Sequence, residues 1–150
     1  MDLYPWLKVL HILPAVVAVG FNMSYAIWLA RAAREPTHMS WTLRGIKTLD
    51  DRFANPAYGL LFLLGVAMVL MRWQFTQPWI AISIGLYLVA VLMGLLVYSP
   101  LLRRQLAVLE ASGPEAAEFQ SLSSRARSVG IALGAVVVVI IGLMVLKPGA

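Results

Sequence analysis

The sequence predicts an all-α polytopic membrane protein: four transmembrane helices in an antiparallel bundle, with both termini outside. The first observation behind this prediction is composition, because 61% of the 150 residues are hydrophobic and only 13% are charged. A typical soluble domain is roughly 45–50% apolar and about 25% charged. The second observation is that the apolar residues, with a mean hydropathy of +0.81, gather into four separate runs. A soluble chain of this size cannot bury that much apolar surface.

The same composition excludes several classes of protein. The apolar excess excludes an ordinary soluble globule and a disordered chain. The absence of cysteine excludes a disulfide-stapled module and thiolate metal sites. The net charge of +5 does not indicate nucleic-acid binding, since no stretch is long and polar enough to form a basic soluble domain. The expected partner is the lipid bilayer.

The chain reads as one domain, residues 1–150, with four spans of the length needed to cross roughly 30 Å of hydrocarbon. The predicted spans cover residues 3–30, 57–73, 79–99 and 129–146. Asn55-Pro56 predicts a helix start, because a capping side chain precedes a proline in the first turn. Gln77-Pro78 predicts a second start. Ser112-Gly113-Pro114-Glu115 predicts a break, followed by a helix that begins with a capping box near Pro114.

Two helices are expected outside the spans. The third helix continues past Tyr98 through residues 101–111, and with the start of the fourth it forms a hairpin that projects from the bilayer. A short interfacial helix is expected at residues 41–49, within the polar segment 31–54.

Basic residues set the predicted orientation. Nine of the twelve lie in two loops on the same side of the membrane: Arg31, Arg34, Arg44, Lys47, Arg52, Arg103, Arg104, Arg125 and Arg127. The positive-inside rule therefore places loops 31–55 and 100–128 in the cytoplasm. Tyr4, Trp6 and Trp73 fall at the opposite, outer ends of the spans, where amphipathic rings are favoured. The membrane expected from this pattern is a bacterial plasma (inner) membrane.

Small residues recur at helical spacing in the third and fourth spans. The fourth has Gly130 and Gly134 four residues apart, extended by Ala126 and Gly142 on the same face. Such faces let helix backbones approach closely in lipid. Packing within one chain, a homo-oligomer and a larger membrane complex are all compatible with this pattern.

His11 is the candidate functional residue, because an ionisable side chain inside a span is costly and marks a functional site by default. Pro14 follows it and removes the hydrogen bond to the Leu10 carbonyl. Asn22 lies eleven residues further on, three helical turns away and on the same face. A neutral imidazole can ligate haem b or a divalent metal, or relay protons. A purely structural hydrogen bond between helices is the other interpretation. His38 is expected to be exposed in a loop.

No motif for conventional enzyme chemistry is present. The sequence has no phosphate-binding loop, hydrolase elbow or zinc motif. All seven acidic residues, Asp50 among them, are expected in loops or termini. No catalytic residue is therefore assigned, and the sequence leans toward a protein that is not an enzyme.

The lead Tyr4-Pro5-Trp6-Leu7-Lys8-Val9-Leu10-His11-Ile12 resembles the first helix of a group of small bacterial membrane proteins. The group includes HemJ-type protoporphyrinogen oxidases, CopD-like copper-resistance domains and a family of predicted integral membrane proteins of unknown function. The segment 50–70, with a proline heading the second span and a glycine within it, resembles the last of these. In HemJ-like proteins the matching histidine is implicated in haem binding, and the resemblance implies that role for His11 alone.

Three functions follow as alternatives. The leading one is a haem-b-binding or redox-associated membrane protein with His11 as the axial ligand and Asn22 beside it. The second is a non-catalytic accessory or assembly subunit of a membrane complex. The third is a permease for a small solute or metal, for which the spans supply few polar residues.

Overall fold

The computed structural model describes residues 2–149, and within them every regular element is helical. In chain order these are α1 (Tyr4–Ala32), the 3₁₀ turn η1 (Pro36–His38), α2 (Met39–Leu49), the π-helical turn η2 (Asp50–Ala54), α3 (Asn55–Arg72), α4 (Pro78–Met93), the π-helical turn η3 (Gly94–Tyr98), α5 (Ser99–Ser112) and α6 (Ala117–Leu146). Four helical rods are long and apolar enough to cross a membrane: 4–32, 36–72, 78–112 and 117–146. The all-α, four-span fold class is therefore confirmed.

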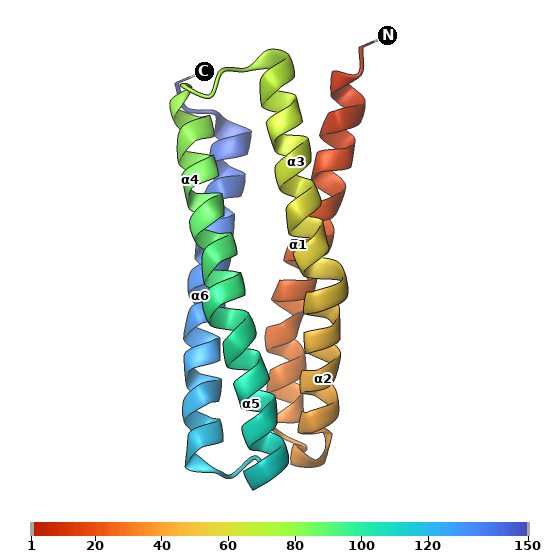
Figure 1. Ribbon diagram of the computed structural model, residues 1–150, viewed down its shortest axis with the longest axis vertical. Helices are drawn as coiled ribbons and strands as arrows, with labels where there is room; N and C mark the ends of the chain where they lie inside the picture. Colours follow the sequence, from red (N-terminus) through yellow and green to blue (C-terminus); the bar gives the residue numbers. More distant parts are fainter. Residues whose placement is uncertain (1, 150) are drawn as a thin grey trace.

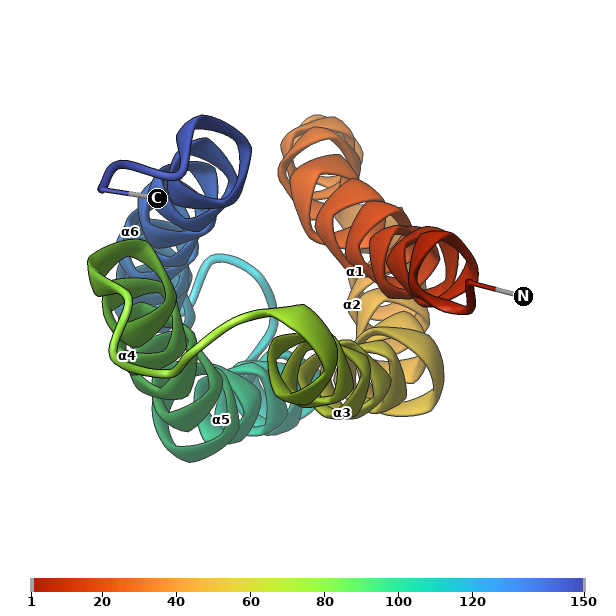
Figure 2. The same ribbon diagram turned by 90° about the horizontal axis from the view of Figure 1, so that it is seen from above.

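The four rods run antiparallel, with both termini and the α3–α4 turn at one end (Figure 1). We call this the terminal end. The other end carries the α1–α2 and α5–α6 turns, and we call it the basic end because nine of the twelve Lys and Arg residues lie toward it in the sequence. Seen from above, α3 stands beside α1 and α4 beside α6 (Figure 2), while α6 also contacts α1.

Both of the middle rods contain a π-helical turn immediately before an x-Pro step. The Asn55 backbone N–H donates to the carbonyl of Asp50, and the Ser99 N–H donates to that of Gly94, each five residues back. Pro56 and Pro100 follow and have no N–H to donate. A shift to π-type bonding accommodates this loss without ending the helix. The prediction of a helix start at Asn55-Pro56 is therefore wrong, because α2, η2 and α3 form one continuous rod. A helix is present where the short interfacial helix was predicted, but this helix, α2, continues into α3 and is not a separate element.

The chain breaks are partly as expected. Gln77 is extended and Pro78 opens α4, which confirms that start. Gly113 adopts a positive φ of 80°, which favours glycine and ends α5. The predicted capping box is wrong, because α6 begins only at Ala117 and has no side-chain cap. The Pro114 carbonyl instead accepts a hydrogen bond from the Gln120 side chain at 2.7 Å.

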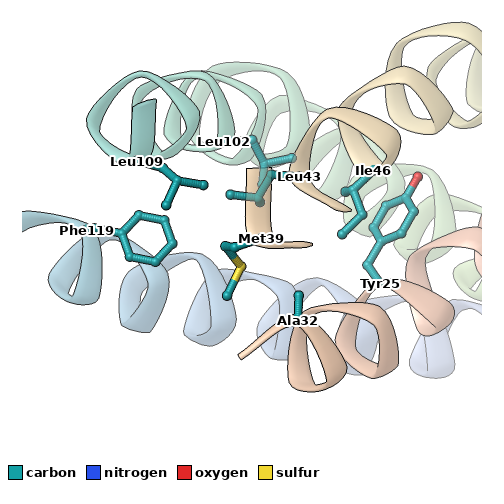
Figure 3. Close-up of a cluster of buried hydrophobic side chains, with 8 residues drawn as sticks. All are labelled: Tyr25, Ala32, Met39, Leu43, Ile46, Leu102, Leu109 and Phe119. Atoms are coloured by element: carbon teal, nitrogen blue, oxygen red, sulfur yellow. The ribbon is translucent and has the colours of Figure 1, made fainter. Parts of the chain in front are cut away.

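The main cluster of buried side chains lies at the basic end, where α1, α2, α5 and α6 meet (Figure 3). Its members are Tyr25, Ala32, Met39, Leu43, Ile46, Leu102, Leu109 and Phe119. Toward the terminal end, large apolar side chains such as Val16, Leu63 and Val138 are more than 60% exposed. That exposure suits helices surrounded by lipid, which is as apolar as the side chains themselves.

Aromatic and cationic side chains close the terminal end. The Trp73 indole donates to the Tyr4 hydroxyl at 2.7 Å and packs edge-to-face on Trp79 at 5.2 Å. The Arg72 guanidinium lies 4.5 Å from the centre of the Tyr4 ring, and the Lys147 ammonium lies 4.6 Å from that of Trp73. These contacts are cation–π interactions. They join both chain ends to the α3–α4 turn.

Candidate functional site

His11 lies in the contact between α1 and α3, against Gly65. A Cβ atom added to Gly65 would sit 3.0 Å from His11 Cε1 and 3.6 Å from Nδ1. Any side chain at position 65 would therefore compete for the space that the imidazole occupies. The absence of a side chain at Gly65 lets the imidazole pack against the backbone of α3. Sequence periodicity alone did not identify this partner.

The His11 ring is partly enclosed by the protein and has one buried nitrogen. Nδ1 is buried and has no hydrogen-bond partner within residues 2–149. The residue as a whole is only half-buried. The backbone of Leu61, one turn before Gly65, is a polar neighbour of the ring. Pro14 is buried inside α1, which continues through it without a break.

Asn22 faces α3 as His11 does, which agrees with the shared face predicted for the two residues. Its amide donates both protons, to the Ala18 carbonyl at 2.9 Å and to the Tyr58 hydroxyl at 2.6 Å. The two contact points on α3, Tyr58 and Gly65, are seven residues apart, or about 10 Å along a helix. The structure therefore does not bring Asn22 to His11, and the amide is engaged in joining helices.

Tyr58 extends this contact to a third helix. Its backbone carbonyl accepts a hydrogen bond of 2.6 Å from the Tyr87 hydroxyl of α4. The Tyr87 ring stacks on Phe62 of α3 with ring centres 5.6 Å apart. We call Asn22, Tyr58 and Tyr87 the polar bridge, because it links α1, α3 and α4 within the apolar part of the bundle. Interhelical hydrogen bonds of this kind stabilise membrane bundles.

Asp50 was expected in a loop, and this expectation is wrong. It belongs to the π-helical turn η2 and is 5% exposed. Its carboxylate accepts a long hydrogen bond of 3.5 Å from the Asn55 side chain. Helix α1 packs against η2 and contributes Tyr25, whose buried hydroxyl has no partner in the described chain. The continuity of the rod through Pro56 places Asp50 in packed helix, and no local sequence signal indicates it.

The other predicted features have plainer surroundings. His38 is exposed, as expected, and lies 3.6 Å from the Glu35 carboxylate. Within residues 2–149 no group of three or more His, Cys, Asp or Glu side chains is placed to hold a metal ion. On α6, a Cβ at Gly130 would meet Tyr98 at 3.9 Å, whereas Gly134 and Gly142 have no neighbouring atom within 4 Å. Packing within the chain thus accounts for one of these glycines.

A comparison with known families gives a match over almost the whole chain. The model of a family described as a predicted integral membrane protein, DUF2269, matches residues 5–148. No curated protein and no solved structure matches the chain. Since the match covers all four long helices, the chain belongs to the DUF2269 family of predicted integral membrane proteins.

Proposed function

We propose that this membrane protein binds haem b, with His11 as the axial ligand. The observation that supports the proposal is the half-buried imidazole that Gly65 admits between α1 and α3. Of the two histidines in the sequence, His11 is the one that lies in a predicted span. A neutral imidazole in an apolar helical bundle is a common haem ligand.

The surroundings of His11 fit such a ligand. A ligating histidine usually turns its second nitrogen toward a protein carbonyl, which fixes the ring. Here Nδ1 is buried and has no hydrogen-bond partner among residues 2–149, and the Leu61 backbone is a polar neighbour of the ring. His11 would hold the haem iron through an imidazole nitrogen. Bound haem would supply one-electron chemistry, while the chain holds the ring in place and excludes water with apolar side chains.

The test is a visible spectrum of the protein purified in detergent, before and after haem reconstitution. We expect a Soret band at about one haem per chain, lost in His11→Ala and retained in His38→Ala. The second variant is a matched control, because His38 is exposed and lies in η1, at the α1–α2 turn of the basic end. Equal spectra for the wild-type protein and His11→Ala would overturn the proposal.

The orientation proposed with this function places the basic end in the cytoplasm of a bacterial plasma membrane. The supporting observation is the gathering of nine basic residues at one end of the bundle. Because the sequence has no cysteine, single introduced thiols report sidedness cleanly. In intact cells an impermeant thiol reagent should label Thr76→Cys, in the α3–α4 turn, and not Ser112→Cys, at the α5–α6 turn. The reverse pattern would contradict this orientation.

An accessory subunit of a membrane complex is the second candidate function. The open space at Gly134 and Gly142 supports it, because small residues without a partner in the chain leave room for another helix. A stoichiometric partner that copurifies with the wild-type protein should be lost in Gly134→Leu. It should be retained in Gly20→Leu, which fills similar open space on α1. Loss in both variants, or no partner at all, would count against this role.

A further inference from the structure

A pocket lies at the basic end, where α1 turns into α2. Its volume is about 520 Å³, and its lining comprises Trp28, Arg31, Ala32, Glu35, His38, Trp41 and Thr42. A smaller cavity of about 260 Å³ adjoins it and is lined by Arg31, Arg34 and Glu35. Arg31 and Glu35 line both cavities. The pocket is about 20 residues from His11 along α1, or roughly 30 Å at the rise of an α-helix.

The charges around the pocket favour an anion. The Glu35 carboxylate lies 3.6 Å from the His38 imidazole, and among residues 2–149 neither Arg31 nor Arg34 has an acidic partner. Arg31 lines both cavities and Arg34 lines the smaller one, so two guanidinium groups without an acidic partner border this pair of cavities. The planar guanidinium binds phosphate through paired, charge-assisted hydrogen bonds.

Two exposed tryptophans line the pocket, a feature that favours a position at the level of lipid headgroups. Trp28 is 49% exposed and Trp41 is 76% exposed, although both are large aromatic side chains. Exposed tryptophan is typical of the boundary between hydrocarbon and water, where the ring is in an apolar region and the indole N–H meets polar groups. Trp28 is on α1 and Trp41 on α2, so the two rings flank the pocket from different helices.

An apolar strip continues from the pocket along the outside of α1 toward the terminal end. Ile27 is four residues before Arg31, and Met23 is four residues before Ile27, so the three side chains lie above one another on one helix face. Ile27 and Met23 are 65% and 72% exposed. A molecule with its phosphate at Arg31 therefore has, next to it on the terminal-end side, an apolar surface on which an acyl chain can lie. Inorganic phosphate would contact only the arginine side chains and not the apolar strip.

We propose that this pocket binds the phosphate group of a membrane phospholipid, with Arg31 and Arg34 holding the phosphate and the acyl chain lying on Ile27 and Met23. Trp28 and Trp41 flank the headgroup. The site is distinct from that of His11 and does not depend on haem binding.

The experiment measures phospholipid bound to the full chain in detergent by native mass spectrometry, with added phosphatidylglycerol as the probe. We expect Arg31→Gln/Arg34→Gln to lower the affinity for this lipid by at least about tenfold, the equivalent of one charge-assisted hydrogen bond. The matched control is Arg125→Gln/Arg127→Gln, which removes the same charge from exposed positions on α6. We expect a change of less than about twofold in the control, because long-range charge alone is screened.

Three outcomes would overturn the proposal. An equal loss in both double variants would show a general attraction between basic and anionic groups. No specific adduct with the wild-type protein would show that the pocket holds no lipid. Displacement of the lipid by millimolar inorganic phosphate would show that the ligand is the free anion. Circular dichroism of each variant checks that the helices are intact, which exposed Arg→Gln substitutions should not alter.

Discussion

At the basic end of the bundle, Leu43, Leu102 and Phe119 are each 2% exposed and pack as side chains do in a soluble core. In the spans nearer the terminal end, by contrast, much of the apolar surface faces outward. The buried cluster there is smaller, comprising Val69, Trp79 and Ile80. Specific contacts between helices, such as His11 against Gly65 and Asn22 with Tyr58, join α1 to α3. The difference has a physical basis, because burying a leucine from water stabilises a fold, while exchanging lipid for protein around it changes little. The two regions should therefore respond differently to the same substitution.

The largest effect is expected for a cavity at the basic end. Leu43→Ala should lower the free energy of unfolding by about 2–5 kcal/mol, the cost of emptying a filled apolar site. Leu63→Ala is the matched control in a span, where the side chain is 66% exposed, and its effect should be well under 1 kcal/mol. Thermal or denaturant unfolding in one detergent measures both. Equal losses at the two positions would show that the spans also rely on side-chain burial.

The contact between His11 and Gly65 allows a sharper test within the spans. Gly65→Ala places a methyl group 3.0 Å from His11 Cε1, and such overpacking should cost about 1–3 kcal/mol. Gly59→Ala, on the same helix with nothing within 4 Å, should be neutral or slightly stabilising, since alanine favours helix.

A double variant isolates the contact between the two residues. If the cost of Gly65→Ala arises from the imidazole, adding His11→Ala should remove most of it. The coupling energy in this cycle should then be of the order of 1 kcal/mol. Additive effects would contradict the contact between the ring and Gly65. Haem content of the same variants tests the ligand role separately.

The polar bridge should contribute less than either of these contacts. Tyr58→Phe removes the hydroxyl that accepts from Asn22 at 2.6 Å and leaves one amide proton without its partner. Interhelical hydrogen bonds in membrane proteins average about 0.6 kcal/mol, with larger values near 1.7 kcal/mol, and we expect a loss in that range. Tyr25→Phe is the control, because it removes a tyrosine hydroxyl that has no hydrogen-bond partner among residues 2–149. A loss above about 3 kcal/mol would show that the bridge has a larger role than one hydrogen bond.

The sequence was sufficient for the four long helices, because lipid leaves the backbone few ways to satisfy its hydrogen bonds and apolar runs of this length must be helical. It was misleading at Asn55-Pro56. A proline in the first turn of a helix and a proline after a π-helical turn have the same local sequence, and only the packing of η2 against α1 distinguishes them. The loop predicted for Asp50 failed for the same reason.

The candidate site was predictable in part. Helical periodicity placed His11 and Asn22 on one face of α1, and both do face α3. Periodicity carries no information about the other helix, so neither Gly65 nor Tyr58 was predictable as a partner. Both contacts join residues 36 or more positions apart. Glycine at position 65 was visible in the sequence, but the chain has eleven glycines, and only the fold shows which one receives the imidazole.

The smallest effect is expected for the ion pairs on the surface of the basic end. The Arg44 guanidinium lies 2.7 Å from the Glu110 carboxylate, and their side chains are 64% and 43% exposed. Such pairs contribute about 0–1 kcal/mol, since water and salt screen the charges. Glu110→Gln should therefore lower the unfolding free energy by less than about 0.5 kcal/mol, and the difference from wild type should shrink as salt is raised from 0.05 to about 0.5 M. A salt-independent loss above 1 kcal/mol would mean that α2 and α5 are joined by this pair more than by the buried Leu43 and Leu102. It would thereby reverse the contrast between the packed core and the surface at this end.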